Sequence, residues 1–125
     1  MMNPLLPRVL AVHRKDDASP PLQIALDLLV PANLAHFEGH FPGLPILPGV
    51  VELDWALRLA REHLAVPDTF QRMENVKFLA LVRPDARLRL ELRHDPEKAR
   101  LEFSFTGDAR TYSSGRIVFG EEAAA

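Results

Sequence analysis

Residues 36–55 read HFEGHFPGLPILPGVVELDW, and this stretch joins a proline-rich loop to the start of an apolar helix. Pro42, Pro45 and Pro48 recur every third residue, and each proline fixes φ and removes a backbone N–H donor. We therefore expect an ordered loop that is neither helix nor strand. A packed loop is favoured over a flexible linker because the segment also carries large apolar side chains, namely Phe37, Phe41, Leu44, Ile46 and Leu47.

Directly after this loop, residues 50–64 have the spacing of a helix. Apolar residues recur at i, i+3, i+7, i+10 and i+14 from Val50 to Leu64, and further apolar residues widen this stripe. A helix that is so apolar is expected to be enclosed by other elements. Pro48 and Gly49 suit its N-terminus, where the missing amide donor of proline costs nothing.

Most of the remaining sequence has the character of strands. Residues 88–92 and 101–105 alternate between apolar and polar side chains, which is typical of strands with one buried and one wet face. The expected element order is therefore two strands, the loop, the helix and four strands. This order predicts an α+β domain in which a curved, mostly antiparallel sheet wraps one helix. The expected strands are residues 5–14, 22–30, 73–82, 86–93, 99–106 and 111–119.

The composition is that of an ordinary globular protein. The chain has 125 residues, which fits one domain over residues 1–125, and its net charge of −2 argues against a general nucleic-acid binder. It has no cysteine, so a disulfide scaffold, a thiolate zinc site and a cysteine nucleophile are excluded. No apolar run approaches the ~20 residues of a membrane span, and the start shows no secretory signal. We therefore expect a cytoplasmic protein.

Three groups in and after the loop carry the chemistry. His40 supplies an imidazole on a rigid loop, and Gly49 offers an unpaired N–H donor backed by the positive end of the helix dipole. Asp54 lies on an otherwise apolar helix, so we expect desolvation to favour the protonated form of its carboxyl unless the group is paired or hydrated. A base, an acid and an oxyanion donor are what loss of a β-hydroxyl next to a thioester requires.

The run from His40 to Asp54 resembles the active-site motif of the FabA/FabZ-type 3-hydroxyacyl-acyl-carrier-protein dehydratases. That motif begins with His-Phe-Pro and places Glu or Asp fourteen residues after the histidine, which is the spacing from 40 to 54. The short chain and the Leu-Asp-Trp sequence look most like the ApeI-like dehydratases of aryl polyene and related lipid pathways. The resemblance implies the hotdog fold, in which a curved antiparallel sheet of about six strands wraps one long central helix.

The resemblance also implies a role for each group of the motif. His40 would take the C2 proton, Asp54 would give a proton to the departing hydroxyl directly or through water, and the Gly49 N–H would polarise the thioester carbonyl. The substrate would come on an acyl carrier protein, and the protein would be a homodimer in which each site takes the acid from the neighbouring subunit. No cofactor is expected, because the reaction is redox-neutral and the sequence has no glycine-rich phosphate loop. Substrate contacts are expected from Phe41, Pro48, Val50 and Arg58.

One departure from the family pattern keeps other functions open. The family usually has Gln four residues after the acid, whereas this chain has Arg58, which would keep the acid ionised or rebuild the site. A non-catalytic hotdog subunit that binds acyl thioesters is therefore one alternative. A hotdog thioesterase is another, although thioesterases usually lack the His-Phe-Pro loop.

Several residues also have simpler interpretations. His36 and His40 flank Glu38, but no third ligand has useful spacing, so we expect no metal site and assign His36 to ordering the loop. Trp55 is expected to pack in the interior or at a dimer interface. The basic side chains of the middle of the chain form either a solvated surface or a docking patch for an acidic carrier protein; they are Arg58, Arg61, Arg72, Lys77, Arg83, Arg87 and Arg89.

Overall fold

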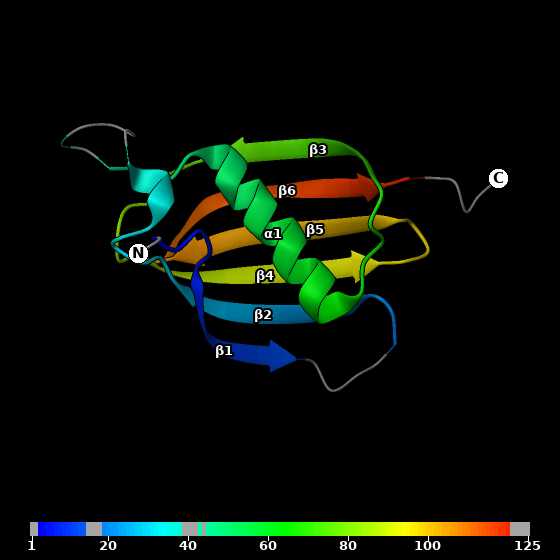
Figure 1. The fold of residues 1–125 in the computed structure, drawn as a ribbon. Coiled ribbons are helices and arrows are strands. Elements are labelled where there is room, and N and C mark those ends of the chain that lie inside the picture. The colour runs from blue at the N-terminus through cyan, green and yellow to red at the C-terminus, as the bar shows by residue number, and fades with distance from the viewer. Residues whose placement is uncertain (1–2, 15–18, 39–42, 44, 121–125) are drawn as a thin grey trace.

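Six strands form a single sheet, and one long helix lies across its concave face (Figure 1). The structure is a computed structural model that describes residues 3–14, 19–38, 43 and 45–120. The long helix, α1, spans Gly49–Leu64, and a short 3-10 helix, η1, spans Ala35–Phe37. The strands are β1 (Arg8–Arg14), β2 (Leu22–Leu29), β3 (Phe70–Phe78), β4 (Arg87–Asp95), β5 (Arg100–Gly107) and β6 (Arg110–Phe119).

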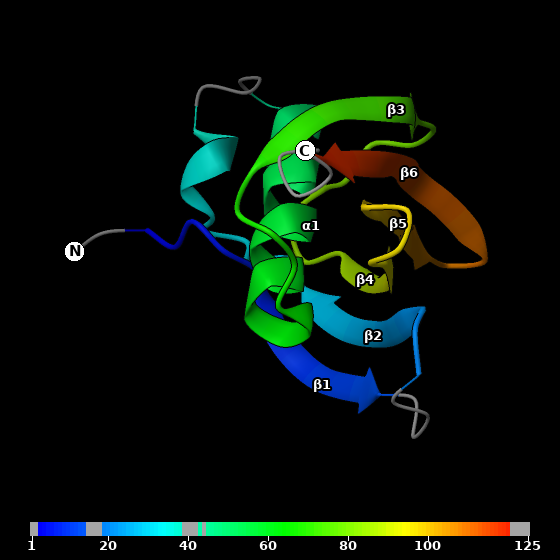
Figure 2. The same ribbon diagram turned by 90° about the vertical axis from the view of Figure 1, so that its right-hand side faces the viewer.

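The strands lie in the order β1-β2-β4-β5-β6-β3, and every neighbouring pair is antiparallel. The sheet bends around α1, as the view turned by a quarter shows (Figure 2). The predicted α+β architecture, a curved antiparallel sheet around one helix, is therefore confirmed together with its element order. β1 and β3 form the two edges of the sheet.

The strand predicted over residues 73–82 is displaced toward the N-terminus, because β3 begins and ends earlier. After β3 the chain leaves the regular ladder, and Leu79 N donates to Tyr112 O at 2.8 Å. Farther on, Val82 O accepts a hydrogen bond from Leu47 N at 2.8 Å. The end of the predicted strand therefore anchors the loop before α1 and does not extend the sheet.

The core lies between α1 and the concave face of the sheet. The alternating residues of β4 and β5 point into it, as period-two patterning predicts. Trp55 and Ala56 of α1 are fully buried against this face. Removing a buried leucine such as Leu90 would cost about 2–5 kcal/mol of unfolding free energy. The inward residues of the two strands are Leu88, Leu90, Leu92, Leu101, Phe103 and Phe105.

The N-terminal segment ties the base of the proline-rich loop to α1. Leu5 O accepts hydrogen bonds from Trp55 Nε1 at 3.1 Å and from His36 Nε2 at 3.2 Å. Ala35 N donates to Pro4 O at 2.8 Å. The assignments of Trp55 to packing and of His36 to ordering the loop are both confirmed by these contacts.

The described part of the loop itself, residues 43 and 45–48, contains neither helix nor strand, as predicted. Phe37 and Leu47 are buried in the core, which confirms that these parts of the segment are packed. Phe41 and Leu44, which we also expected to be packed, lie outside the described residues.

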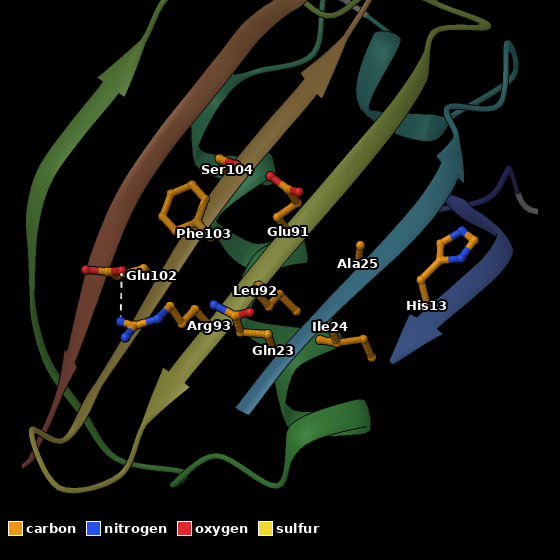
Figure 3. A pocket seen from close by; sticks show the side chains of 10 residues that line it. All are labelled: His13, Gln23, Ile24, Ala25, Glu91, Leu92, Arg93, Glu102, Phe103 and Ser104. Carbon is orange, nitrogen blue, oxygen red and sulfur yellow. Dashed lines mark hydrogen bonds and ion pairs between the residues drawn. The ribbon is translucent and has the colours of Figure 1, made fainter. Parts of the chain in front are cut away.

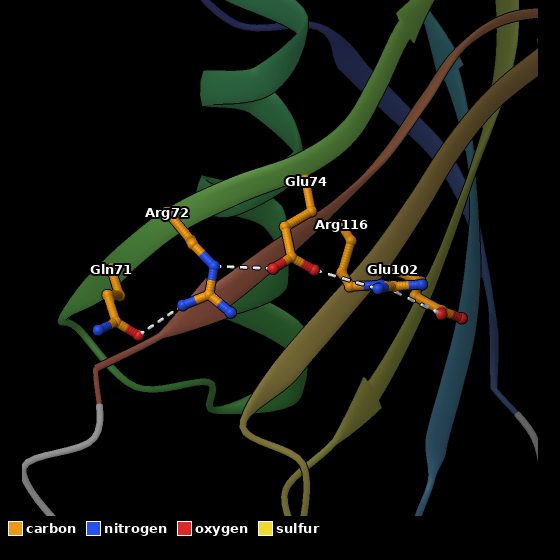
Figure 4. Close-up of polar contacts among 5 residues, drawn as sticks. All are labelled: Gln71, Arg72, Glu74, Glu102 and Arg116. Carbon is orange, nitrogen blue, oxygen red and sulfur yellow. Dashed lines mark hydrogen bonds and ion pairs between the residues drawn. The ribbon is translucent and has the colours of Figure 1, made fainter.

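The outer face of the sheet carries a row of ion pairs across β3, β6 and β5 (Figure 4). Arg72 Nε and Arg116 Nη1 donate to the two oxygens of Glu74 at 2.7 and 3.1 Å, and Arg116 Nε lies 3.8 Å from Glu102. The hydrogen bonds from Arg72 and Arg116 hold the pKa of Glu74 below its usual range. The alternation that buries one face of these strands thus leaves a charged face on the other side.

No helix in the described part of the chain is both long enough and apolar enough to cross a lipid bilayer.

Candidate active site

The first residue of α1 has a backbone donor that no described residue accepts. Pro48 precedes the helix in an extended conformation, with φ −63° and ψ 141°, and no side chain caps this end. Val51 N donates to Pro48 O at 3.0 Å, whereas no described residue accepts a hydrogen bond from Gly49 N. Among the described residues the Gly49 amide is therefore a donor without a partner, at the positive end of the helix dipole, and its role as an oxyanion donor stays a prediction.

A glycine at position 49 is required by a close neighbour. A Cβ built on Gly49 would lie 2.7 Å from Cε1 and 2.8 Å from Cζ of Phe78, which is closer than real Cβ contacts. The ring of Phe78, at the end of β3, thus lies directly on the first residue of α1. Within the described chain, the group that approaches Gly49 closely is this aromatic ring.

Asp54 is half-exposed and paired with a cation. Arg58 Nε donates to Asp54 Oδ2 at 2.8 Å, and the two side chains are 60% and 52% exposed, respectively. The expectation that Asp54 is desolvated is therefore wrong for the single chain. The physical reason is that Asp54 lies on the face of α1 that points away from the sheet, where the i, i+4 spacing brings Arg58 beside it.

Several of the predicted site residues share one stripe of the helix. Val50, Asp54 and Arg58 follow at i, i+4 and i+8, and all three are exposed, with Val50 at 70%. Pro48 and Gly49, which are both half-buried, directly precede Val50 in the chain. His40 and Phe41 lie outside the described residues, so their assigned positions stay predictions.

A second carboxyl, Glu52, was missed by the sequence analysis. Its side chain is only 2% exposed, and Ser113 Oγ donates to its Oε1 at 2.6 Å. Burial raises the pKa of Glu52 to about 7, while the hydrogen bond from Ser113 lowers it and so offsets part of that rise. Helical spacing could have revealed its burial, because Glu52 precedes the buried Trp55, Ala56 and Leu59 by three, four and seven residues and so lies on the same face of the helix.

Comparison with known families identifies the group to which this architecture belongs. The ApeI-like family, described as ApeI dehydratase, matches residues 12–116. The chain belongs to this family. A crystal structure of an uncharacterized protein from Erwinia carotovora subsp. atroseptica superposes with a TM-score of 0.82 and 40% identity, covering 92% of this chain and 96% of that one. The dehydratase heterocomplex ApeI:P from Xenorhabdus doucetiae gives a TM-score of 0.78 and 31% identity, with coverage of 90% and 96%.

Curated relatives are 3-hydroxyacyl-[acyl-carrier-protein] dehydratases named FabZ. The protein from Chloroflexus aggregans is 37% identical over 91 residues, which cover 66% of this chain and 62% of the relative. That from Erythrobacter litoralis is 35% identical over 89 residues, covering 64% and 58%. The chain thus spans about three-fifths of the length of these relatives. The predicted FabA/FabZ-type resemblance, the ApeI-like branch and the hotdog fold are confirmed.

Two hollows on the described surface of this ApeI-like chain lie away from the entry of α1. A depression of about 480 Å³ lies on the outer face of the sheet, on the opposite side from α1, and is bordered by His13, Glu91 and Ser104 (Figure 3). A groove of about 600 Å³ lies between the N-terminal segment and α1, where Trp55 and Arg58 line it. Of these two, only the groove borders a predicted site residue, which is Arg58, and Asp54 is not among the residues that line it.

The described residues contain no group of three or more His, Cys, Asp or Glu side chains that could hold a metal ion. Of the two histidines considered as ligands, only His36 is described, and its Nε2 donates to a backbone carbonyl.

Four of the seven basic side chains singled out in the sequence have partners. Arg58 pairs with Asp54, Arg72 with Glu74 and Arg89 with Asp27, and Arg61 donates to a backbone oxygen. Within the described chain, no residue pairs with the exposed side chains of Lys77, Arg83 and Arg87. The solvated-surface interpretation therefore fits most of these cations, and three remain available to a partner.

Proposed function

We propose that this chain is a cytoplasmic dehydratase that converts a 3-hydroxyacyl thioester on acyl carrier protein to the trans-2-enoyl thioester. The pathway would be fatty acid or aryl-polyene-type lipid biosynthesis. The observation that carries the proposal is the exposed Asp54 carboxyl on α1, a helix whose first residue, Gly49, has no hydrogen-bond partner for its N–H among the described residues. Membership of the ApeI-like family and the names of the FabZ relatives support the same chemistry.

The reaction assigns one task to each group. His40 takes the C2 proton, and the electron pair of the broken C–H bond forms the C2–C3 double bond. The C3–O bond breaks, and the hydroxyl leaves as water with a proton supplied by Asp54 directly or through water. The Gly49 N–H stabilises the charge that develops on the thioester oxygen. Because Asp54 is ion-paired in the single chain, delivery of its proton requires the Arg58 contact to loosen when substrate binds.

We further propose a homodimer in which each site takes Asp54 from the neighbouring subunit. β3 is an edge strand, and its end and the segment after it expose large apolar side chains. Exposed edges and apolar patches of this kind favour pairing with another chain. Val50, at the helix entry, is exposed as well, which brings the predicted site next to this surface. The exposed residues of the β3 edge are Phe70, Phe78, Leu79 and Leu81.

The carrier protein would dock near the entry of α1. β3 ends and β4 begins at the end of the sheet where α1 starts (Figure 1). Lys77 lies in β3 next to its last residue, Arg87 is the first residue of β4, and Arg83 lies between these strands. Of the seven basic side chains named from the sequence, these are the three without a partner in the described chain, so an acidic carrier that docks here would meet them first.

A turnover assay tests the proposal. A 3-hydroxyacyl thioester on carrier protein is incubated with the wild type, and loss of water is followed by mass. We expect product from the wild type, a loss of roughly 10²–10⁴-fold in His40→Ala and Asp54→Asn, and normal turnover in Asp68→Asn, a control at an exposed acid outside the stripe. Light scattering of the wild type should give the mass of a dimer. A wild type that releases free acid would instead identify a thioesterase.

One observation favours a second candidate, a non-catalytic subunit that binds the acyl thioester. The Asp54 carboxyl is held in an ion pair by Arg58, which stands at the position where the family usually has Gln. The Xenorhabdus doucetiae neighbour, which is named as a heterocomplex, shows that a protein of this family assembles with a different subunit. A wild type that binds the thioester without releasing water, and gains turnover when Arg58→Gln is introduced, would establish this candidate.

A further inference from the structure

The buried pair of Glu52 and Ser113 joins the entry of α1 to the sheet. Glu52 lies three residues after Gly49, in the first turn of the helix, and Ser113 lies in β6. Ser113 is fully buried and Glu52 is 2% exposed, so their 2.6 Å hydrogen bond is closed to solvent. The reaction proposed above uses neither side chain, although burying a carboxyl is costly without a compensating partner.

The same pair connects to the ring that lies on Gly49. Ser113 stands opposite Phe78 in the ladder between β6 and β3. The Phe78 ring lies where a Cβ of Gly49 would be. Gly49, Glu52, Ser113 and Phe78 thus form a closed set of contacts from the first turn of α1 to β6, to β3 and back. We name these four residues the entry clamp.

We propose that Glu52 is a positioning residue for the Gly49 amide, which it holds in place by clamping the first turn of α1 to Ser113 beneath the Phe78 ring. This inference rests on the proposed function, in which the Gly49 N–H polarises the thioester carbonyl. Glu52 does not touch the reacting atoms, because it faces the sheet while the stripe with Asp54 faces away.

The protonated form of Glu52 is the one that suits this task. Burial raises the pKa of Glu52 to about 7, and no charged side chain of the described residues contributes to this shift. A negative charge beneath the first turn would oppose the charge that develops on an oxyanion held by the Gly49 amide. Loss of the proton therefore lowers turnover. Besides Glu52, the charged and histidine side chains of these elements are Asp54, Arg58, Arg61, Glu62 and His63 of α1, Arg72, Glu74 and Lys77 of β3, Arg100 and Glu102 of β5, and Arg110 and Arg116 of β6.

Most of these charges are engaged elsewhere. Asp54 and Arg58 pair with each other on the exposed stripe. Glu74, Arg116 and Glu102 form the row of ion pairs on the outer face of the sheet (Figure 4). The protonation of Glu52 is therefore governed by its burial and by Ser113.

The first test does not depend on turnover. The amide resonances of Gly49 and Val50 are followed by NMR as pH rises from 5 to 9 in the full chain. We expect a titration with a midpoint of about 7 in the wild type that is absent from Glu52→Gln. In Ser113→Ala the midpoint should rise, because the lost hydrogen bond favours the charged form. Glu62→Gln, at an exposed acid of the same helix, is the matched control and should titrate like the wild type.

The second test measures kcat/KM against pH for the same variants. At pH 6 Glu52→Gln should match the wild type, and at pH 8.5 it should exceed the wild type by about tenfold, because glutamine keeps the hydrogen bond without acquiring charge. Ser113→Ala should lower kcat/KM at pH 6 by roughly fivefold. Thermal unfolding at each pH ensures that only folded protein is compared.

The outcomes separate the two proposals. If the wild type shows no turnover but its Gly49 resonance titrates through Glu52, the dehydratase assignment fails and the entry clamp stands. If Glu52→Gln leaves both the amide titration and the alkaline side of the rate profile unchanged, Glu52 is a structural residue only and the proposal is overturned.

Discussion

Two carboxyl groups that are two residues apart on α1 have opposite environments. Glu52 is buried, and its partner is the neutral hydroxyl of Ser113. Asp54 is half-exposed, and its partner is the guanidinium of Arg58. Residues at i and i+2 point to different faces of a helix, so one acid meets the sheet and the other meets solvent. Position on the helix, more than residue type, therefore sets the environment of each acid.

The largest effect that separates the two acids is the pH dependence of stability. The pKa of Glu52 rises from 4.5 to about 7 on folding, so between these values the folded chain holds a proton that the unfolded chain has lost. Its contribution is complete below pH 4.5 and is lost as pH rises to about 7. The unfolding free energy of the wild type should therefore fall by about 3 kcal/mol over this range relative to Glu52→Gln. Urea denaturation at pH 4.5, 5.5, 6.5 and 7.5 measures the difference.

The comparison must be made between variants because other groups titrate as well. Burial lowers the pKa of His94, so its contribution is lost as pH falls through the usual histidine range, which is the opposite sign. His94 is present in both proteins and cancels in the difference. Parallel curves for the wild type and Glu52→Gln would mean that the buried acid does not hold an extra proton.

Much of the fold was predictable because it depends on repeated local patterns. The alternation in residues 88–92 and 101–105 correctly predicted two strands with one buried face, and the i, i+3, i+7 spacing predicted α1. The strand predicted at 73–82 was misplaced, because its end bonds to the loop before α1 and not to the sheet. Sequence periodicity does not record such long-range backbone pairing.

The candidate site was predictable in its motif and not in its environment. Gly49 and Asp54 were chosen by residue type and spacing, and the structure places the half-buried Gly49 at the first position of α1 and Asp54 on its exposed face. The expected burial of Asp54 was wrong because the helical spacing was not used to assign each residue of α1 to the buried or the exposed face. The same step would have placed Glu52 on the buried face, but its partner Ser113 lies 61 residues away in sequence. No local pattern predicts that contact.

A smaller effect tests the contact between Gly49, at the entry of α1, and the Phe78 ring of β3. Gly49→Ala places a methyl group 2.7 Å from the Phe78 ring, so the ring must move. Because Phe78 is half-exposed, the ring can move at little cost in stability, but it leaves its place over the entry. We expect kcat/KM to fall about tenfold. In a Phe78→Ala background the same change should cost less than about threefold, since the clash is gone. Equal costs in both backgrounds would show that the ring is not the group that glycine accommodates.

The smallest effect concerns the exposed acid and its cation. An exposed i, i+4 ion pair contributes about 0.3–0.5 kcal/mol, so Arg58→Gln should leave the unfolding free energy nearly unchanged. The change frees Asp54 Oδ2 for water or for the departing hydroxyl, and we expect kcat to rise about twofold at low ionic strength. Salt should raise the wild-type rate toward that of the variant, because screening weakens the pair. Arg61→Gln, which removes a cation that bonds to a backbone oxygen, should show neither effect. A rise in KM with unchanged kcat would instead assign Arg58 to substrate binding.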